Sequence, residues 1–259
     1  MKTLIIPLLL LTVLDVHAQE FSMQPKGKVS ELTVEIQNLY TDLKIEGDKG
    51  DAIRVQADHY KGVPEKAAGL RPLSAAGPDN TGIGIYINQS GNTVTISGTH
   101  RGRQRTNYQI TLPANIKLRI NYGTFRSDDI LVHGMRNEVD IKSQVGDIKL
   151  EDVTGPIIAN TLSADINVVF SSLNQSSPSS LASVSGDIDI TLPDNSKGDF
   201  RLNTVSGEVY TDFDFAMVNK SPHHQYWPGT SAAARINGGG VEFAVKSVSG
   251  DIFIRKAKK

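Results

Sequence analysis

The chain has 259 residues, a formal net charge of -1, 39% hydrophobic residues, 21% charged residues and no cysteine. This composition is typical of a folded protein with a sizeable core rather than of a disordered chain. The near-neutral charge argues against a whole-molecule affinity for nucleic acid or for an anionic membrane. The lack of cysteine excludes disulfides, cysteine-ligated zinc, iron–sulfur clusters and a thiol nucleophile.

The amino-terminal segment 1–18 has the organisation of a secretory signal peptide. Lys2 supplies a positive charge, the segment 4–14 is an apolar run, and the segment 16–18 is a small-x-small cleavage site. The run is too short for a membrane span, which needs about 20 apolar residues, and no later stretch is long enough either. We therefore expect cleavage after Ala18 and an exported mature chain, 19–259, that is periplasmic or at the cell surface.

Residues 19–113 form the less regular part of what we expect to be a single β-domain. Residues 19–28 carry no clear pattern, and we expect a flexible amino terminus there. Residues 61–82 are rich in Gly, Pro and Ala, as in an insertion loop. Residues 93–96 and 108–112 alternate apolar and polar side chains, and we interpret them as the two strands of one hairpin.

Residues 114–259 contain a repeated motif that organises the chain. Its clearest copies read Val-Ser-Gly-Asp-Ile and begin at Val184 and Val248. Apolar and polar residues alternate on both sides of the glycine, which indicates strands with one buried face. The glycine or its equivalent stands at positions 123, 146, 164, 186, 207 and 250, and the successive differences are 23, 18, 22, 21 and 43.

A repeat of about 20 residues is in the size range of solenoid proteins. One unit cannot bury its apolar face alone, so we expect the units to stack and to pair their strands in parallel. Glycine suits a corner that needs a positive φ or leaves no room for a side chain. The expected structural turns of the repeat are Gly123, Gly146, Gly186, Gly207 and Gly250.

The copies at 183–190 and 247–254, with Asn-Gly-Gly-Gly at 237–240 before the second, resemble a bacterial family of candidate adhesins. The members of this family are exported β-strand-repeat proteins of unknown function. The resemblance implies an all-β, right-handed parallel β-solenoid with coils of about 20 residues. It provides no catalytic residues. Gln144 is the clearest departure from the pattern, since most copies have valine or leucine at that position.

An acidic residue follows the glycine, or the alanine at position 164, in each copy from 146 onward. Stacked at a spacing of about 4.8 Å, these acids could bind calcium or supply paired carboxylates for glycoside hydrolysis. Alternatively, each acid accepts hydrogen bonds from the amides of its own corner. Recurrence in every unit, and the absence of the calcium motif Gly-Gly-x-Gly-x-Asp, favour the structural role, so we expect no metal and no cofactor. The acids are Asp147, Asp165, Asp187, Glu208 and Asp251.

The longest interruption of the repeat, residues 214–238, is the best candidate binding region, because loops on a rigid scaffold often carry function. Two adjacent histidines could ligate a metal, but no third ligand is evident, and an exposed polar loop is favoured. The neighbouring aromatic residues either pack over the side of the solenoid or contact a partner or a sugar. The candidate binding residues are His223, His224, Tyr226 and Trp227.

Two basic clusters stand outside the repeat motif. The first could meet anionic glycans or lipid headgroups, although a solvated turn is the simpler interpretation; it contains His100, Arg101, Arg103 and Arg105. The second follows the last strand, and we expect it to keep that strand soluble and unpaired; it contains Arg255, Lys256, Lys258 and Lys259.

We expect a non-enzymatic exported scaffold or binding module of the bacterial cell envelope, of which an adhesin would be one form. No nucleophile elbow, zinc-protease helix or phosphate-binding loop occurs in the sequence, and no residue is a catalytic candidate. The expected partner is an envelope protein or a surface glycan, not nucleic acid, and the chain does not span the membrane. Two alternatives are a carbohydrate-active β-helix enzyme and an accessory of envelope-stress signalling. The sequence leaves the oligomeric state open.

Overall fold

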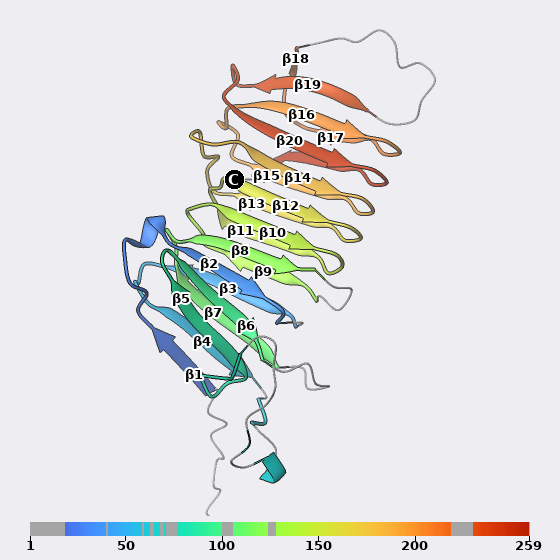
Figure 1. The fold of residues 1–259 in the computed structure, drawn as a ribbon. Helices are drawn as coiled ribbons and strands as arrows, with labels where there is room; N and C mark the ends of the chain where they lie inside the picture. Colours follow the sequence, from blue (N-terminus) through green and yellow to red (C-terminus); the bar gives the residue numbers. More distant parts are fainter. Residues whose placement is uncertain are drawn as a thin grey trace, which may run out of the picture.

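A computed structural model of the chain describes residues 19–39, 41–58, 60–62, 65–67, 70, 77–99, 106–123, 128–218 and 230–258. In these residues the fold is all-β, with two sheets of ten and eleven strands and no α-helix (Figure 1). Two short 3-10 turns, η1 (Val29–Glu31) and η2 (Glu65–Ala67), complete the secondary structure. No helix in the described part of the chain is long and apolar enough to cross a bilayer.

Most strands are paired in parallel, and antiparallel pairs occur only toward the two ends of the stack. In spatial order, the ten-strand sheet contains β1 (Gln19–Met23), β4 (Ile53–Asp58), β7 (Asn107–Pro113), β3 (Leu43–Asp48), β9 (Ile130–His133), β11 (Ile148–Val153), β13 (Ile166–Phe170), β15 (Ile188–Leu192), β21 (Ile252–Lys256) and β17 (Val209–Thr211). The eleven-strand sheet contains β18 (Ala216–Met217), β19 (Ser231–Ile236), β16 (Gly198–Thr204), β20 (Val241–Ser247), β14 (Ser179–Ser183), β12 (Ile157–Thr161), β10 (Val139–Ser143), β8 (Lys117–Tyr122), β2 (Thr33–Gln37), β6 (Thr93–Gly98) and β5 (Ile85–Ser90).

The chain repeatedly passes from the eleven-strand sheet, across a corner, to the ten-strand sheet. We call each such pair of strands a coil; β10–β11, β12–β13 and β14–β15 are three successive examples. Equivalent residues of successive coils lie directly opposite one another. Ile148 pairs with Ile166 of the next coil, and Ile166 pairs with Ile188 of the coil after that. The expected alternation and parallel pairing are therefore present.

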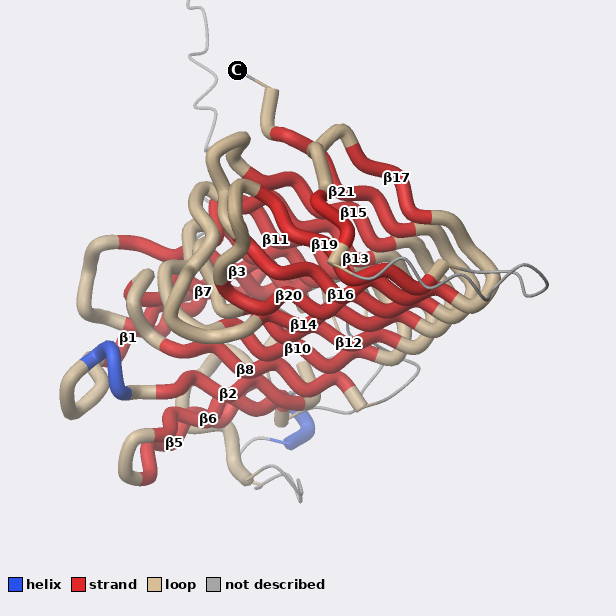
Figure 2. The backbone as a smooth tube through the Cα atoms, turned by 90° about the horizontal axis from the view of Figure 1, so that it is seen from above, coloured by secondary structure: helices blue, strands red, loops and turns tan. Residues whose placement is uncertain are grey.

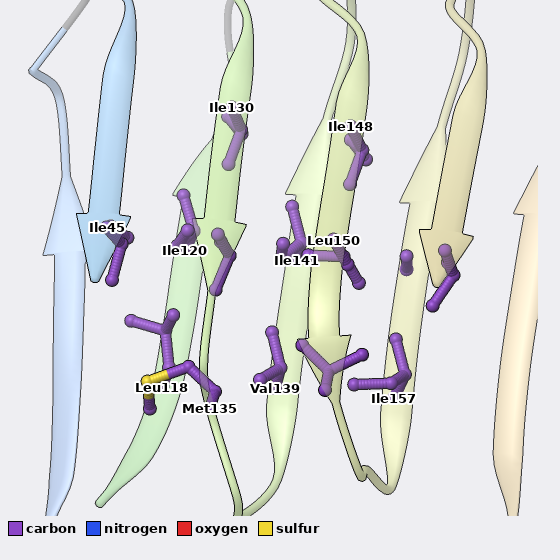
Figure 3. Packing of buried hydrophobic residues seen from close by; sticks show 14 of the residues in the cluster. Ile45, Leu118, Ile120, Ile130, Met135, Val139, Ile141, Ile148, Leu150 and Ile157 are labelled. Atoms are coloured by element: carbon purple, nitrogen blue, oxygen red, sulfur yellow. The ribbon is translucent and has the colours of Figure 1, made fainter. Parts of the chain in front are cut away.

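The core is a set of aligned aliphatic ladders between the two sheets. Ile148, Ile166, Ile188 and Ile252 stand in one such ladder, and all four are fully buried. Figure 3 shows side chains from both sheets meeting in this space. Burial of each such side chain stabilises the fold by about 1.5–3 kcal/mol. Alternation places every second residue of a strand in this core, and this is why the polar residues between them face outward.

The last coil, β20–β21, does not lie at the end of the stack. It is inserted between β14–β15 and β16–β17: β20 pairs with both β14 and β16, and β21 with both β15 and β17. The expectation that basic residues keep the last strand unpaired is therefore wrong. Arg255 instead forms a salt bridge with Asp189 on the neighbouring strand β15.

The first coil, β2–β3, is inserted in the same way at the other end. β2 lies between β6 and β8, and β3 lies between β7 and β9. The hairpin expected from residues 93–96 and 108–112 is wrong, because β6 and β7 belong to different sheets and form a coil. The observed hairpin is β5–β6, which turns at Gly91 and Asn92.

Antiparallel strands close both ends of the stack. The expected flexible amino terminus is wrong for residues 19–23, which form β1 and pair along their whole length with β4. At the opposite end, β19 covers the edge of β16, and β18 covers β19. Within 214–238, which the sequence presents as an inserted loop, the structure thus places β18 and β19. The last interval between corner glycines is long because the chain makes this detour before it returns to insert β20.

Removal of residues 241–259 is expected to release more than the last two strands. Because β16 and β17 reach the stack only through β20 and β21, strands β16 to β19 should lose protection from amide hydrogen exchange. Strands β8 to β13, which pair with one another, should keep theirs. Retained protection of β17, whose pairing partner among the described strands is β21, would contradict this dependence on the inserted coil.

Candidate functional site

The candidate binding residues His223, His224, Tyr226 and Trp227 lie outside the described residues, as do His100, Arg101, Arg103 and Arg105 and the signal peptide 1–18. The structure therefore brings none of these side chains into a described site. The chemistry-bearing residues that it does place are the recurring acids, the corner glycines and the outward-facing side chains of the ten-strand sheet.

The recurring acids form a continuous hydrogen-bonded ladder along one corner of the stack. The backbone N–H of Asp147 donates to Oδ1 of Asp129 at 2.9 Å, and that of Asp165 donates to Oδ1 of Asp147 at 3.1 Å. The ladder continues with Asp187 N–H to Asp165, Asp251 N–H to Asp187 and Glu208 N–H to Asp251, at 2.8, 2.8 and 2.9 Å.

Each carboxylate from Asp129 to Asp251 therefore binds an amide of the neighbouring coil, and the expectation that each acid caps its own corner is wrong. The main-chain carbonyls complete the link in the opposite direction, because Ile130 N–H donates to the carbonyl of Asp147 and Ile148 N–H to that of Asp165. Sequence comparison of the copies missed Asp129, since the residue before it is Asp128 rather than glycine.

This use of the carboxylates weighs against metal binding by the ladder. In the part of the chain that the structure describes, no three His, Asp or Glu side chains come together in a way that could hold a metal ion. Carboxylates engaged with backbone amides are held in place by the fold, and their recurrence follows from the stacking of the coils.

The corner glycines allow the coils to approach closely. A methyl group on Gly186 would overlap the carbonyl oxygen of Ala164, and one on Gly250 would overlap that of Gly186. Gly146 and Gly207 meet the carbonyls of Asp128 and Gly250 in the same way. Of these four, only Gly146 has a positive φ, so lack of space rather than backbone conformation selects glycine at the other three.

Gly123 differs from the other expected turn glycines. A methyl group there would come no closer than 3.8 Å to Oδ1 of Asn121, because Asp128 rather than Gly123 stands opposite Gly146.

The aliphatic residues that stand two positions before the corner glycines, or before Ala164, lie outside the core. Leu162, Val184 and Val205 are 43%, 42% and 49% exposed. Gln144 is accommodated in this row, where its Nε2 donates to the carbonyl of Gly123 at 2.7 Å.

A groove of about 670 Å³ with both polar and apolar lining crosses the outer face of the ten-strand sheet over β4, β7, β3, β9, β11 and β13. Its floor is a row of side chains in register from strand to strand, and four aspartates lie along one side. The row consists of Gln56, Gln109, Lys44, Leu131, Lys149 and Asn167, and the aspartates are Asp42, Asp58, Asp129 and Asp147.

The groove combines amide, ammonium and carboxylate groups on a rigid surface. Lys149 forms a salt bridge with Glu151 at 2.7 Å, and His133 binds Glu46 at 2.7 Å in the adjacent row of the sheet. Amides donate and accept hydrogen bonds, and ammonium groups donate them. The surface therefore offers both donors and acceptors to a polar ligand. The sequence did not reveal the groove, because its members come from six strands that are widely separated along the chain.

A loop around Asp79 is tied to β7 by a hydrogen bond from Tyr108. Oδ1 of Asp79 accepts the N–H groups of Thr81 and Gly82, both at 2.9 Å, and Oδ2 accepts that of Gly84 at 2.8 Å. Burial raises the pKa of Asp79, but these hydrogen bonds outweigh it and hold the pKa below its usual value. Tyr108, which lines the groove, donates its hydroxyl to the carbonyl of Ile83 in the same loop at 2.8 Å.

Replacement of Gly186 by alanine is expected to lower the free energy of unfolding by about 1–3 kcal/mol, because the added methyl overlaps a rigid backbone carbonyl. Gly123→Ala is the matched control, since that methyl enters open space next to Asn121. Urea unfolding of both variants measures the difference. Equal stability of the two would contradict the close approach of the corners.

Asp79→Asn is expected to lower stability at neutral pH by about 1 kcal/mol, since the hydrogen bonds to the carboxylate are charge-assisted but partly open to solvent. The folded-state pKa of Asp79 lies below its unfolded value, so this contribution is present above about pH 4 and is lost as the pH falls through the folded pKa. Urea unfolding at several pH values should show the gap between wild type and variant closing in acid. The exposed Asp51→Asn variant is the control, and a gap that stays constant with pH would exclude this role of Asp79.

Similarity to solved structures is broad in coverage and low in identity. A candidate cell adhesion protein from Clostridium sporogenes is 12% identical, with 93% of this chain and 100% of that chain covered and a TM-score of 0.49. A candidate adhesin from Bacteroides fragilis is also 12% identical, with coverage of 93% and 98% and a TM-score of 0.45. A candidate lipid binding protein from Parabacteroides distasonis, 12% identical with coverage of 94% and 98%, has a TM-score of 0.30. No curated protein matches the chain significantly.

A family model gives the decisive comparison. It matches residues 115–255, which is more than half of the chain and extends from β8 to β21. The match includes the corner glycines from Gly146 onward and the inserted coil β20–β21. The chain belongs to the Toastrack DUF4097 family.

Proposed function

We propose that this protein is a non-enzymatic, exported binding scaffold of the bacterial cell envelope, and that its ligand lies in the groove of the ten-strand sheet. The observation that carries the proposal is the groove itself, in which amide, ammonium and carboxylate groups stand in register on six paired strands. Its volume of about 670 Å³ lies within the range of about 300–1,000 Å³ that is usual for ligand sites.

The proposed scaffold is a single domain over residues 19–259, a right-handed parallel solenoid with coils of about 20 residues. The pairing of Ile148 with Ile166, and of Ile166 with Ile188, supports this coil size. Export rests on the expected signal peptide with cleavage after Ala18.

The chemistry of the groove favours an extended polar ligand such as a surface glycan. The exposed amides of Gln56, Gln109 and Asn167 share the floor with the ammonium groups of Lys44 and Lys149, so a chain of hydroxyl groups finds donors and acceptors along the row. An adhesin-like role would use such a surface for capture without chemical conversion. His223, His224, Tyr226 and Trp227 remain proposed as additional contacts from the 214–238 segment.

The arrangement of acids favours binding over hydrolysis. A glycosidase needs two carboxylates placed on either side of one glycosidic bond. Asp129 and Asp147 in the groove already accept backbone amides of the next coil. Tyr108, the aromatic residue among the described lining residues, has its hydroxyl engaged with Ile83 and is only 6% exposed, so it offers no stacking surface for a sugar.

Capture of envelope polysaccharide from the same bacterium tests the proposal. The double variant Lys44→Ala with Gln109→Ala removes one cross-strand lysine–amide pair from the groove floor. Loss of a charge-assisted and a neutral hydrogen bond should weaken capture by about tenfold or more.

The matched control is Lys142→Ala with Asn121→Ala, an exposed lysine–amide pair in the same register on the outer face of the eleven-strand sheet. This control should capture as much polysaccharide as the wild type. Equal capture by the groove variant and the control would remove the groove as the site. Capture of an envelope protein alone, unaffected by the groove variant, would exclude the glycan as the ligand.

A further inference from the structure

The two sheets end at different heights at the carboxyl-terminal end of the stack. Beyond the coil β16–β17, the eleven-strand sheet continues with β19 and β18, whereas the ten-strand sheet stops at β17. Figure 1 shows β18 and β19 at the extreme end of the stack, and Figure 2 shows β17 outermost beside β21 and β15. In the described part of the chain, β17 therefore has a strand on one side only.

The backbone of β17 is ready to accept another strand. In a parallel ladder, the N–H and C=O of one residue point to the same neighbour, and those of the next residue point to the other side. The carbonyl of Glu208 accepts Ile252 N–H, so Glu208 and Tyr210 face β21. Val209 and Thr211 then direct their N–H and C=O groups to the open side, and such an edge is a template for strand addition.

The acid ladder also ends at this edge. Each ladder acid from Asp129 to Asp251 receives the backbone amide of the neighbouring coil, and Glu208 is the last member. Among the described residues, no backbone amide donates to the Glu208 carboxylate. An added strand that continues the pattern would place a donor at this position.

A stack of side chains is open at the same place. The guanidinium of Arg255 lies 4.9 Å from the ring centre of Phe253, and the ring of Tyr210 stacks on Phe253 at 5.3 Å with an angle of 13° between the planes. Because β17 is the outermost strand, the side of Tyr210 that faces away from Phe253 has no neighbouring strand among the described residues, and Tyr210 is 51% exposed. Of eight large hydrophobic residues that are exposed in the described chain, four lie in this short stretch: Val205, Tyr210, Met217 and Val218.

The charge of this end determines what can bind. Residues 205–218 contain Glu208, Asp212 and Asp214 and no lysine or arginine. Of the neighbouring cations, Arg255 pairs with Asp189 at 2.9 Å. Lys256 pairs with Asp194 at 3.1 Å, and its ammonium group also lies 5.3 Å from the centre of the Phe213 ring, on the side of Asp212 and Asp214, so Glu208 is the acid of this stretch without a basic partner among the described residues. Antiparallel pairing of two copies about Tyr210 would set Glu208 opposite Asp212, and like charges directly opposite destabilise a pair of strands.

We infer that β17 is an acceptor edge for an extended, lysine- or arginine-bearing segment of another exported protein, which adds as a further strand of the ten-strand sheet. Main-chain hydrogen bonds to Val209 and Thr211 hold the segment, Tyr210 packs against one of its side chains, and Glu208 pairs with a basic one. This site is separate from the groove, which lies over β4 to β13, and does not depend on the function proposed for it.

Three labelled synthetic peptides test the inference by fluorescence anisotropy with the full mature chain. The first alternates valine with lysine, the second alternates valine with glutamate, and the third is the lysine peptide with all of its backbone amides methylated. The lysine peptide should bind, and both others should bind at least about tenfold more weakly, because one has the wrong charge and the other cannot form a strand ladder. No binding of the lysine peptide at millimolar concentration, or equal binding of the methylated form, would overturn the inference.

Matched variants locate the binding edge. Tyr210→Ser should lower the affinity for the lysine peptide by about three- to tenfold, and Glu208→Gln should lower it by about two- to fivefold. Glu20→Gln, an exposed glutamate on β1 at the opposite edge of the same sheet, should leave binding unchanged. Hydrogen exchange of the wild type should show new protection at 208–212 and none at 19–23. Protection confined to β1 or to the groove strands would overturn the assignment to β17, whatever the outcome of polysaccharide capture.

Discussion

The close approach of successive corners is the constraint on which the remainder of this structure depends. At each corner, an aspartate carboxylate accepts the amide of the neighbouring coil, and the main-chain carbonyl of that neighbour accepts an amide in return. These two bonds fix the height and the register of one coil on the next. Gly186 and Gly250 leave the space in which the corners meet. Once the corners are in register, the isoleucines that follow them must fall directly opposite one another, and the aliphatic ladders of the core result.

The insertion of both terminal coils ties the ends of the chain into the stack. Neither β2–β3 nor β20–β21 forms an end of the solenoid core, because each is paired on both sides. Antiparallel strands stand at the physical ends instead. Terminal units of solenoids need such protection, since an uncovered coil would expose both its apolar face and its backbone. The exception is β17, where the eleven-strand sheet is extended and the ten-strand sheet is not.

The two surfaces proposed to bind ligands differ in the chemistry that they present. The groove presents outward side chains in register, and a ligand there would meet amide, ammonium and carboxylate groups. The β17 edge presents backbone groups, a tyrosine ring and a glutamate at the point where a regular pattern stops. A long stacked fold is suited to carry both, because sites far apart along its axis can be occupied at the same time by ligands of different chemistry.

The sequence by itself determined the features that depend on local pattern, and only the tertiary structure decided which strands are neighbours. Alternation around Val-Ser-Gly-Asp-Ile was sufficient for the all-β class, the stacked units and the parallel pairing, because each unit carries its own period-two signal. It did not show that Asp147 binds the amide of the neighbouring coil, since that choice depends on the distance between coils. Residues 93–96 and 108–112 have the pattern of a hairpin, yet they lie in different sheets, because the pairing partners of both strands come from distant coils. The groove and the β17 edge are likewise assembled by pairing between residues far apart in the sequence, and no local pattern encodes that order.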